Sequence, residues 1–406
     1  FSSEIKSISA YCKSGIDYDG VVEYFTFQNL FSDRTLWHDI KALPPGHYLE
    51  IDLKGNTEGT LDVDSQHKNL ISARGLLSQA MRDSGLRCRM VQYWDFDFFR
   101  EKFTEGYQTL VHSLEEVFES SVKRQLISDV EVGSYLSGGM DSGSITAIAS
   151  KHFKDKRQSF KTFTIGFDLH SASGLELSFD ERQKAEHMSY LFGTEHYEMV
   201  LKAGDMERCL PSLVYHLEEP RVGQSYPNYY ASKLASRFVK VVLSGCGGDE
   251  IFGGYPWRYM QVVHSSNFDE FVERSLGFWQ RLFPGIEHEK VFSPIKDKVT
   301  IEPKEVFHDV FPESMRYGDY APETVLEMSL YFESKTFLHG LLVVEDKLSM
   351  AHSLETRVPF LDNEMVDFAM KVPAGIKVRL SEKEVSVLDH NNQPVLRTNK
   401  GKILLR

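Results

Sequence analysis

The chain has 406 residues, of which 41% are hydrophobic and 26% charged, as is ordinary for a globular protein. The formal net charge of -13 argues against a nucleic-acid surface as the main partner, and no apolar run is long enough to cross a bilayer. Cys12, Cys88, Cys209 and Cys246 are scattered and form no CxxC pair. They suit free thiols in a reducing, cytoplasmic compartment better than a disulfide framework or a zinc site.

The length favours two domains, and the character of the sequence changes near residue 95. We therefore expect one domain over residues 1–95 and another over 96–406. The chain opens with "FSSEIKSI", which reads as a finished element, and ends with "GKILLR", a helix-like run without a stop signal. From these ends we expect an excerpt of a longer polypeptide with a truncated C-terminus.

The first part of the chain consists of short pieces. A helix is expected around residues 18–27, and the turn residues Pro44, Pro45 and Gly46 precede an alternating strand in "ALPPGHYLEIDL". Residues 52–90 are polar and poorly periodic. They read as a loop, a linker or a local insertion.

Beyond "YWDFDFF" the pattern becomes α/β. Leu110, Leu114, Val117 and Leu126 fall on one helical stripe. Strands alternating with helices predict a parallel sheet joined by crossovers. The expected strands are "VEVGSYL", "FTIGF", "EHYEMVL" and "VKVVLSG", and "ERQKAEHMSYLF" is an expected helix.

A glycine-rich turn, "SGGMDS", separates the first of these strands from a run of small residues. A turn between a strand end and a helix start is an anion site, because its N–H groups and the helix dipole favour negative charge. Gly138 and Gly139 allow a close backbone approach, and Ser137 and Ser142 can donate hydrogen bonds. Asp141 suits this site only if Mg²⁺ lies between it and the phosphates. The alternative is a plain turn with Asp141 as the helix N-cap.

The stretch "KVVLSGCGGDEIFGGY" (240–255) repeats this logic with Ser244, Gly245 and Asp249. The carboxyl ends of parallel strands line one crevice, so both loops can face one ligand and Asp141 and Asp249 can share a divalent cation. The alternative is a flexible surface loop with solvated acids. A third stretch, "EDKLSMAHSLETRVPFLD" (345–362), places Leu348, Ala351 and Leu354 on a buried helix face, which packing explains as well as chemistry does.

Taken together, these segments resemble the glutamine-hydrolysing asparagine synthetase family. "SGGMDS" matches its PP-loop, the signature of ATP pyrophosphatases. "LSGCGGDEIFGGY" matches its second loop, in which the family usually has an acidic residue at the position of Cys246. "DKLSMAHSLETRVPFLD" matches its core helix and the turn that follows. "FSSEIKSI", "EYFTFQNLFSDRTLW" and "LPPGHYLEIDL" match the end of its glutaminase domain. The resemblance covers most of the chain outside about 52–92 and 265–325.

The resemblance implies an α/β fold class. Residues 96–406 would form a parallel-sheet, α-hydrolase-like PP-loop synthetase domain, preceded over 1–95 by the C-terminal part of an α+β Ntn-type glutaminase domain. In this family a substrate carboxylate attacks the α-phosphate of ATP in the presence of Mg²⁺, giving an acyl-adenylate and pyrophosphate. Ammonia, from glutamine or from solution, then displaces AMP to form an amide.

The same resemblance assigns roles to particular residues. It places Lys402 where its charge offsets that on the α-phosphate, whereas read alone Lys402 would be a solvated charge. The pyrophosphate loop would comprise Ser137, Gly138, Gly139, Asp141 and Ser142. The magnesium ligands would be Asp141 and Asp249, the residues near the nucleotide Ile165, Ser244 and Gly245, and the catalytic candidates Lys402, Cys246 and Tyr255.

Two departures from the family pattern bear on activity. The family's glutaminase uses an N-terminal Cys nucleophile upstream of "FSSEIKSI", and neither Cys12 nor Cys88 can replace it, so residues 1–406 alone are not expected to hydrolyse glutamine. The segment "EEPRVGQSYP" (218–227) differs from the usual asparagine synthetase sequence, and in the family this segment borders the acid substrate. Aspartate, giving asparagine, is the leading substrate, and a sugar acid or natural-product precursor is the alternative. A catalytically silent homologue is a third reading, against which the two retained acids argue. The oligomeric state is left open, a homodimer included.

Cys246 itself has two readings. It fills space as a small, weakly polar residue, which we favour, or it acts as the base that takes a proton from the attacking nitrogen. A thiol with an ordinary pKa of about 8.5 is mostly protonated at neutral pH. Nearby phosphates would raise that pKa, whereas Lys402 or Mg²⁺ would lower it.

Overall fold

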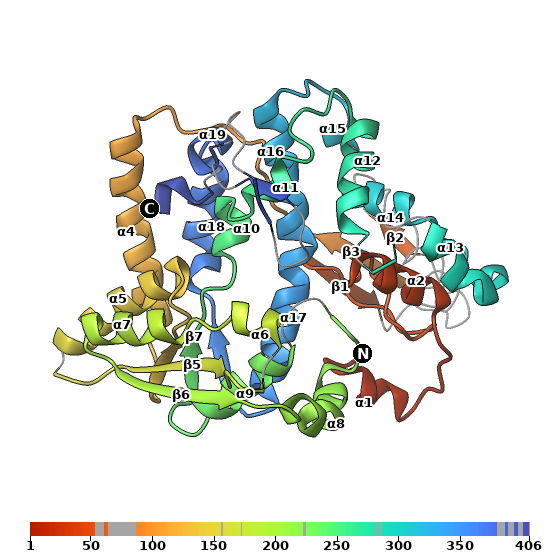
Figure 1. Cartoon of the computed structure of the whole chain (residues 1–406). Helices are drawn as coiled ribbons and strands as arrows, with labels where there is room; N and C mark the ends of the chain where they lie inside the picture. The colour runs from red at the N-terminus through yellow and green to blue at the C-terminus, as the bar shows by residue number, and fades with distance from the viewer. Residues whose placement is uncertain are drawn as a thin grey trace. The chain divides into compact units, whose positions relative to one another are not determined.

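The computed structural model describes the greater part of the chain and divides into two compact units (Figure 1). The described residues are 1–52, 61–63, 87–155, 157–171, 173–221, 225–280, 282–283, 286–379, 386–388, 394–396 and 401–405. Unit 1 comprises 1–97, 218–220 and 264–336, and unit 2 comprises 98–217, 221–263 and 337–406.

Unit 1 contains a three-stranded sheet of order β1-β3-β2, in which β1 and β3 are antiparallel and β2 and β3 parallel. The strands are β1 (His47–Asp52), β2 (Leu61–Val63) and β3 (Arg87–Gln92). Strand β1 is the predicted strand after the turn at Gly46, whose φ of 73° favours glycine. Of the three readings of 52–90, a loop or a linker is wrong for β2 and for the start of β3, whereas a local insertion stays a prediction. Both strands are held by β-ladder hydrogen bonds that no local periodicity reveals, and residues 53–60 and 64–86 lie outside the described part.

The helices of unit 1 enclose an aromatic core. Asp17 caps α2 by accepting a hydrogen bond from the N–H of Gly20 at 2.9 Å. Phe27, Phe307 and Phe332 are all fully buried, with the Phe307 and Phe332 ring centroids 4.3 Å apart. The helices are α1 (Ile5–Ser9), α2 (Tyr18–Phe27), α12 (Phe268–Trp279), α13 (Ile286–Phe292), η1 (Ser293–Lys298), α14 (Pro303–Asp309), α15 (Glu313–Arg316) and α16 (Pro322–Lys335).

Unit 2 is built on a five-stranded parallel sheet of order β6-β5-β4-β7-β8. This confirms the predicted α/β class with a parallel sheet. The strands are β4 (Val132–Tyr135), β5 (Lys161–Phe167), β6 (Glu195–Leu201), β7 (Val241–Leu243) and β8 (Glu355–Arg357). Strand β8 was not predicted, because a three-residue polar edge strand gives no alternation to detect. A further two-stranded sheet pairs β9 (Ser386–Leu388) with β10 (Pro394–Leu396).

Helices cover the parallel sheet in two groups. Helices α5 and α7 pack on each other and on β4, β5 and β6, whereas α9 and α17 pack on each other and on β5, β6 and β8 (Figure 1). The helices of unit 2 are α4 (Tyr107–Gln125), α5 (Met140–Asp155), α6 (Gly174–Ser178), α7 (Arg182–Phe192), α8 (Asp205–Leu217), α9 (Ser225–Ala235), α10 (Gly248–Phe252), α11 (Pro256–Tyr259), α17 (Phe337–Met350), η2 (Pro359–Leu361), α18 (Asn363–Lys371), α19 (Ala374–Lys377) and η3 (Ile403–Leu405).

The strand order reverses direction between β4 and β7. From β4 the chain proceeds outward to β5 and β6, and then returns past β4 to add β7 and β8. At such a reversal the loops leaving two neighbouring strands diverge, which opens a crevice at their carboxyl ends. The two glycine-rich loops of the sequence leave β4 and β7, so the topology brings them to one place.

Two local expectations need correction. The predicted stripe on α4 includes Leu110 and Leu114, which are buried, but Val117 is only half-buried and Phe118 takes its place. In the third stretch, α17 ends at Met350, so Leu354 is buried from beyond the helix rather than on it. Among the described residues, no helix combines the length and the apolar character needed to span a membrane.

Candidate active site

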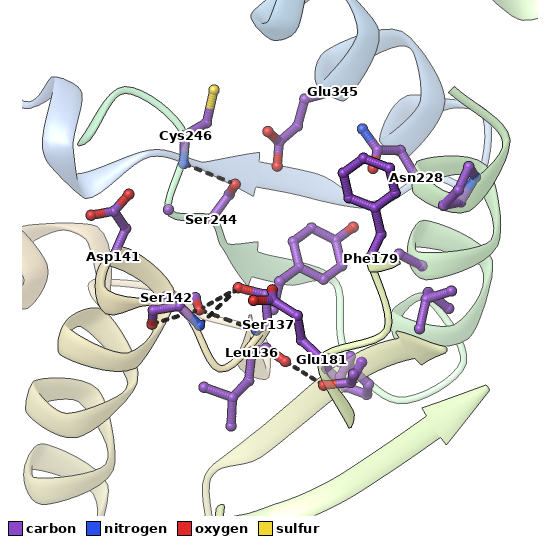
Figure 2. A pocket seen from close by; sticks show the side chains of 18 of the residues that line it. Leu136, Ser137, Asp141, Ser142, Phe179, Glu181, Asn228, Ser244, Cys246 and Glu345 are labelled. Atoms are coloured by element: carbon purple, nitrogen blue, oxygen red, sulfur yellow. Dashed lines mark hydrogen bonds between the residues drawn. The ribbon is translucent and has the colours of Figure 1, made fainter. Parts of the chain in front are cut away.

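A cavity of about 620 Å³ opens at the carboxyl ends of the parallel strands in unit 2 (Figure 2). This volume lies in the range of small-molecule sites. Its walls come from the loop after β4, from β5, from α9, from the loop after β7 and from α17. Of the residues predicted from the sequence, Ser137, Gly139, Asp141, Ser142, Ile165, Ser244, Gly245, Cys246, Asp249 and Lys402 line it.

The loop after β4 is held in shape by its own hydroxyl groups. The N–H of Ser137 donates to Oγ of Ser142 at 3.1 Å, the two hydroxyl oxygens lie 3.0 Å apart, and the N–H of Gly139 donates to Oγ of Ser137 at 3.2 Å (Figure 2). Gly138 has φ of 76°, and a Cβ there would lie 2.4 Å from Cβ of Lys184. Immediately afterwards the 16-residue helix α5 begins, with its positive dipole end at the cavity.

The loop after β7 packs against the start of α5 with no room for side chains. A Cβ on Gly245 would lie 3.0 Å from the backbone N of Ser142. A Cβ on Gly248 would lie 2.7 Å from the carboxyl carbon of Asp141. These two glycines of the stretch 240–255 are therefore needed because the two loops touch at the Asp141 side chain.

Lys402 bridges the two acids. Its Nζ lies 2.6 Å from Oδ1 of Asp249 and also donates a hydrogen bond to Asp141. The side chains of Lys402 and Asp141 are only 9% and 13% exposed, so solvent screens their interaction weakly. The sequence-based alternative of a solvated lysine was wrong, since Lys402 is buried by contacts distant in the sequence.

The charges in this cluster oppose one another. Burial raises the pKa of Asp141 to about 6, with a contribution from the negative charge of Asp249 and an opposing one from Lys402. Burial lowers the pKa of Lys402, but Asp249 and Asp141 raise it more, so the ammonium keeps its proton. The site therefore carries two carboxyl groups and one firmly charged cation.

The two acids fit a magnesium ion bound together with phosphates. Oδ1 of Asp141 is buried and has no hydrogen-bond partner among the described residues, so it keeps a lone pair for a ligand. Within the described part of the chain, no three His, Cys, Asp or Glu side chains gather as a metal site. Mg²⁺ in nucleotide sites takes one or two carboxylates and draws its other ligands from phosphates and water.

The thiol of Cys246 faces a third acid, Glu345 of α17. The pKa of Cys246 lies well above its ordinary value because the thiol is buried and lies near the negative charges of Glu345 and Glu250. At neutral pH the thiol therefore stays protonated and donates a hydrogen bond to Glu345. This favours the space-filling reading of Cys246 over the reading as a base.

Two predicted residues do not line the cavity. Gly138 shapes the first loop from behind. The hydroxyl of Tyr255 donates to Oε1 of Glu250 at 2.7 Å, and the Arg258 guanidinium lies 3.8 Å from the centre of the Tyr255 ring. Burial, followed by the charges of Glu250 and Asp249, raises the pKa of Tyr255. A catalytic role for Tyr255 stays a prediction.

Several lining residues were missed from the sequence. They include Phe179, Glu181, Asn228 and Glu345 (Figure 2). Glu345 is the first residue of the third stretch, "EDKLSM", but no role is predicted for it from the sequence. The sequence feature that could have indicated a functional role for Glu345 is an acidic residue directly after the apolar run "LLVV" on a buried helix. Phe179 and Glu181 lie between α6 and α7, and Asn228 lies on α9; none of the three belongs to a motif.

Comparison with known proteins agrees with this geometry. The family model described as asparagine synthase matches residues 113–406, and the model described as glutamine amidotransferase domain matches 1–61. The asparagine synthetase [glutamine-hydrolyzing] 3 of Bacillus subtilis is 29% identical over 399 residues, which cover 93% of this chain and 56% of that protein. The asparagine synthetase [glutamine-hydrolyzing] 1 of the same organism is 28% identical over 413 residues, covering 93% and 57%.

A putative asparagine synthetase [glutamine-hydrolyzing] of Mycobacterium bovis is 31% identical over 288 residues, which cover 64% of this chain and 42% of that protein. The chain thus spans about half the length of the curated relatives it matches.

The first prediction concerns the charge cluster. Replacing Lys402→Met should raise the pKa of Asp141 further above its value in the unfolded chain. A carboxyl with a raised folded-state pKa loses folding stability as the pH rises through that pKa. In urea unfolding, the free energy of unfolding of the variant should therefore be slightly below that of the wild type at about pH 5. At about pH 8 it should be lower by about 1 to 3 kcal/mol. Lys402→Arg, which keeps the charge, is the control, and a deficit independent of pH would contradict the assigned cluster.

Proposed function

The chain belongs to the asparagine synthase family, and from that premise we propose that it carries the ATP-dependent, amide-forming half of such a ligase. A substrate carboxylate attacks the α-phosphate of ATP and releases pyrophosphate, and ammonia then displaces AMP from the acyl-adenylate. The observation that carries this proposal is the meeting of two glycine loops, two carboxylates and one buried lysine in a single cavity at the carboxyl ends of β4 and β7.

The phosphates of ATP are assigned to the loop after β4. Ser137, Gly139 and Ser142 offer hydroxyl and N–H donors at the N-terminus of α5, where an anion is favoured. Asp141 and Asp249 would hold Mg²⁺, which supplies positive charge beside the pyrophosphate. Lys402, already held by the two acids, supplies a second positive charge where negative charge develops on the α-phosphate.

The acid substrate is assigned to the side of the cavity lined by Cys246, Leu341 and Glu345. The curated relatives named above are asparagine synthetases, so aspartate is the leading substrate and asparagine the product. The amidotransferase match over residues 1–61 supports glutamine as the source of ammonia in the whole protein.

The experiment that tests this function is exchange of radioactive pyrophosphate into ATP with a panel of carboxylic acids, aspartate first. Exchange that depends on aspartate supports the proposal, and exchange with a sugar acid instead would redirect the substrate but keep the chemistry. A chain that binds ATP and exchanges with no acid would be a silent homologue, contrary to the proposal.

The second prediction concerns the metal ligands. Asp141→Asn should abolish acid-dependent pyrophosphate exchange and weaken Mg²⁺-dependent ATP binding, because one of two acids in a dication site is lost. ATP binding would be measured by calorimetry with and without Mg²⁺. Near-normal exchange in this variant would show that Asp141 is no metal ligand.

The third prediction concerns Cys246. Since its thiol stays protonated, Cys246→Ser should keep most of the amide-forming activity, because a hydroxyl can still donate to Glu345. The rate of amide formation from ammonia would be compared with pyrophosphate exchange in the same preparation. A loss of about a hundredfold or more in amide formation with exchange intact is the scale expected for losing a general base. That result would make Cys246 a catalytic group.

A further inference from the structure

Four carboxyl side chains line the cavity, and three of them already have a cationic partner. Asp141 and Asp249 pair with Lys402. Glu181 lies 3.5 Å from Nζ of Lys184. Glu345 is the exception among these four, since the partners described for it are the hydroxyl of Ser244 and the thiol of Cys246, both neutral donors.

The position of Glu345 is fixed by two elements. Its backbone belongs to α17, which packs on α9 and β8, and its side chain extends from that helix toward Ser244 and Cys246 in the loop after β7 (Figure 2). Ser244 is buried, and its Oγ also accepts the N–H of Cys246 at 3.3 Å. The carboxyl group is therefore held at the wall that we assign to the acid substrate.

Burial raises the pKa of Glu345, and the hydrogen bonds from Ser244 and Cys246 only partly oppose this shift. A carboxylate without a cationic partner in a partly dry site gains more from taking up a proton than one held by a lysine. Each of the other three acids has a lysine ammonium beside it, so Glu345 is the one of these four for which no cationic partner is described.

We propose that Glu345 is the proton acceptor of the amide-forming step, a role that rests on the proposed function. The nitrogen lone pair of ammonia attacks the acyl carbon, and the carbonyl π pair moves to oxygen. Glu345 removes one N–H proton from the resulting ammonium. The oxygen lone pair then reforms C=O while the bond to AMP breaks, and AMP leaves with the bonding electrons. Glu345 returns its proton to solvent, so acyl-adenylate and ammonia give amide, AMP and one proton.

The test is Glu345→Gln, which keeps the shape and the hydrogen-bonding ability of the side chain but cannot take up the proton. Pyrophosphate exchange, which precedes the ammonia step, should stay at the wild-type level. Amide formation from ammonia should fall by about a hundredfold or more. Asp346→Asn, an exposed neighbour on the same helix, is the matched control and should change neither rate.

A second nucleophile separates proton transfer from a structural role. Hydroxylamine forms an adduct whose nitrogen gives up its proton more readily than that of ammonia. The loss in Glu345→Gln should therefore be much smaller with hydroxylamine. An equal loss with both nucleophiles would mean that Glu345 only shapes the site, and would overturn the proposal.

The pH profile gives a third readout. Amide formation by the wild type should fall on the acid side as Glu345 becomes protonated, and the variant should lack that limb. Among the described residues, the titratable groups that interact with Glu345 from other elements are Tyr135 of β4 and Cys246. Both have raised pKa values, so neither ionises in the acid range. Acid-side titration of Asp141 affects pyrophosphate exchange too, which distinguishes the two groups.

The remaining outcomes are also decisive. If Glu345→Gln weakens exchange and raises the KM for the acid, Glu345 binds a positive group of the substrate and the proposal fails. If the variant keeps both rates, it fails as well. An unmodified chain with no acid-dependent exchange would overturn the proposed function, and this inference with it.

Discussion

The close packing of two loops around the Asp141 side chain governs the arrangement of the cavity. The loop after β7 reaches the start of α5 only because Gly245 and Gly248 present no Cβ to Asp141 and Ser142. Any larger residue at Gly248 would displace the carboxyl group that also pairs with Lys402. The glycines therefore do more than loosen a turn, since they set the separation of the two acids.

This packing has an electrostatic consequence. Two carboxyl groups held close together in a half-buried place repel each other, and each is costly to bury alone. Lys402 offsets this cost by pairing with both acids. Burying these charged groups together costs folding free energy. The same concentration of charge suits the binding of a polyphosphate with a divalent cation, because those ligands can pair with charged groups that the fold has already brought together.

The loop after β7 also joins the phosphate side of the cavity to the acid side. Ser244 and Cys246 lie on one short segment with Asp249, and they present neutral donors to Glu345 while Asp249 faces Lys402. Charged and neutral partners are thus segregated along a few residues. Among the described residues, Glu345 is therefore the cavity carboxyl group with neutral partners only, as a proton acceptor near the reacting carbonyl requires.

The fold class and the two glycine-rich loops could be predicted from the amino-acid sequence. Apolar strand-like segments that alternate with helical segments predicted the parallel sheet. The turns at Ser137–Ser142 and Ser244–Asp249 contain glycines and acids whose chemistry can be inferred from the local sequence. These features depend on short-range patterns of hydrophobicity and backbone freedom, which a sequence displays directly.

How distant residues combine could not be predicted in this way and becomes visible in the folded chain. Lys402 lies 153 positions after Asp249 along the chain, so its burial against both acids has no local signal. Glu345 reads as one more charge on a helix until α17 packs beside the loop after β7. The protonation of Cys246 follows from the same packing, because a pKa depends on desolvation and on neighbouring charges brought together by folding rather than on residue type.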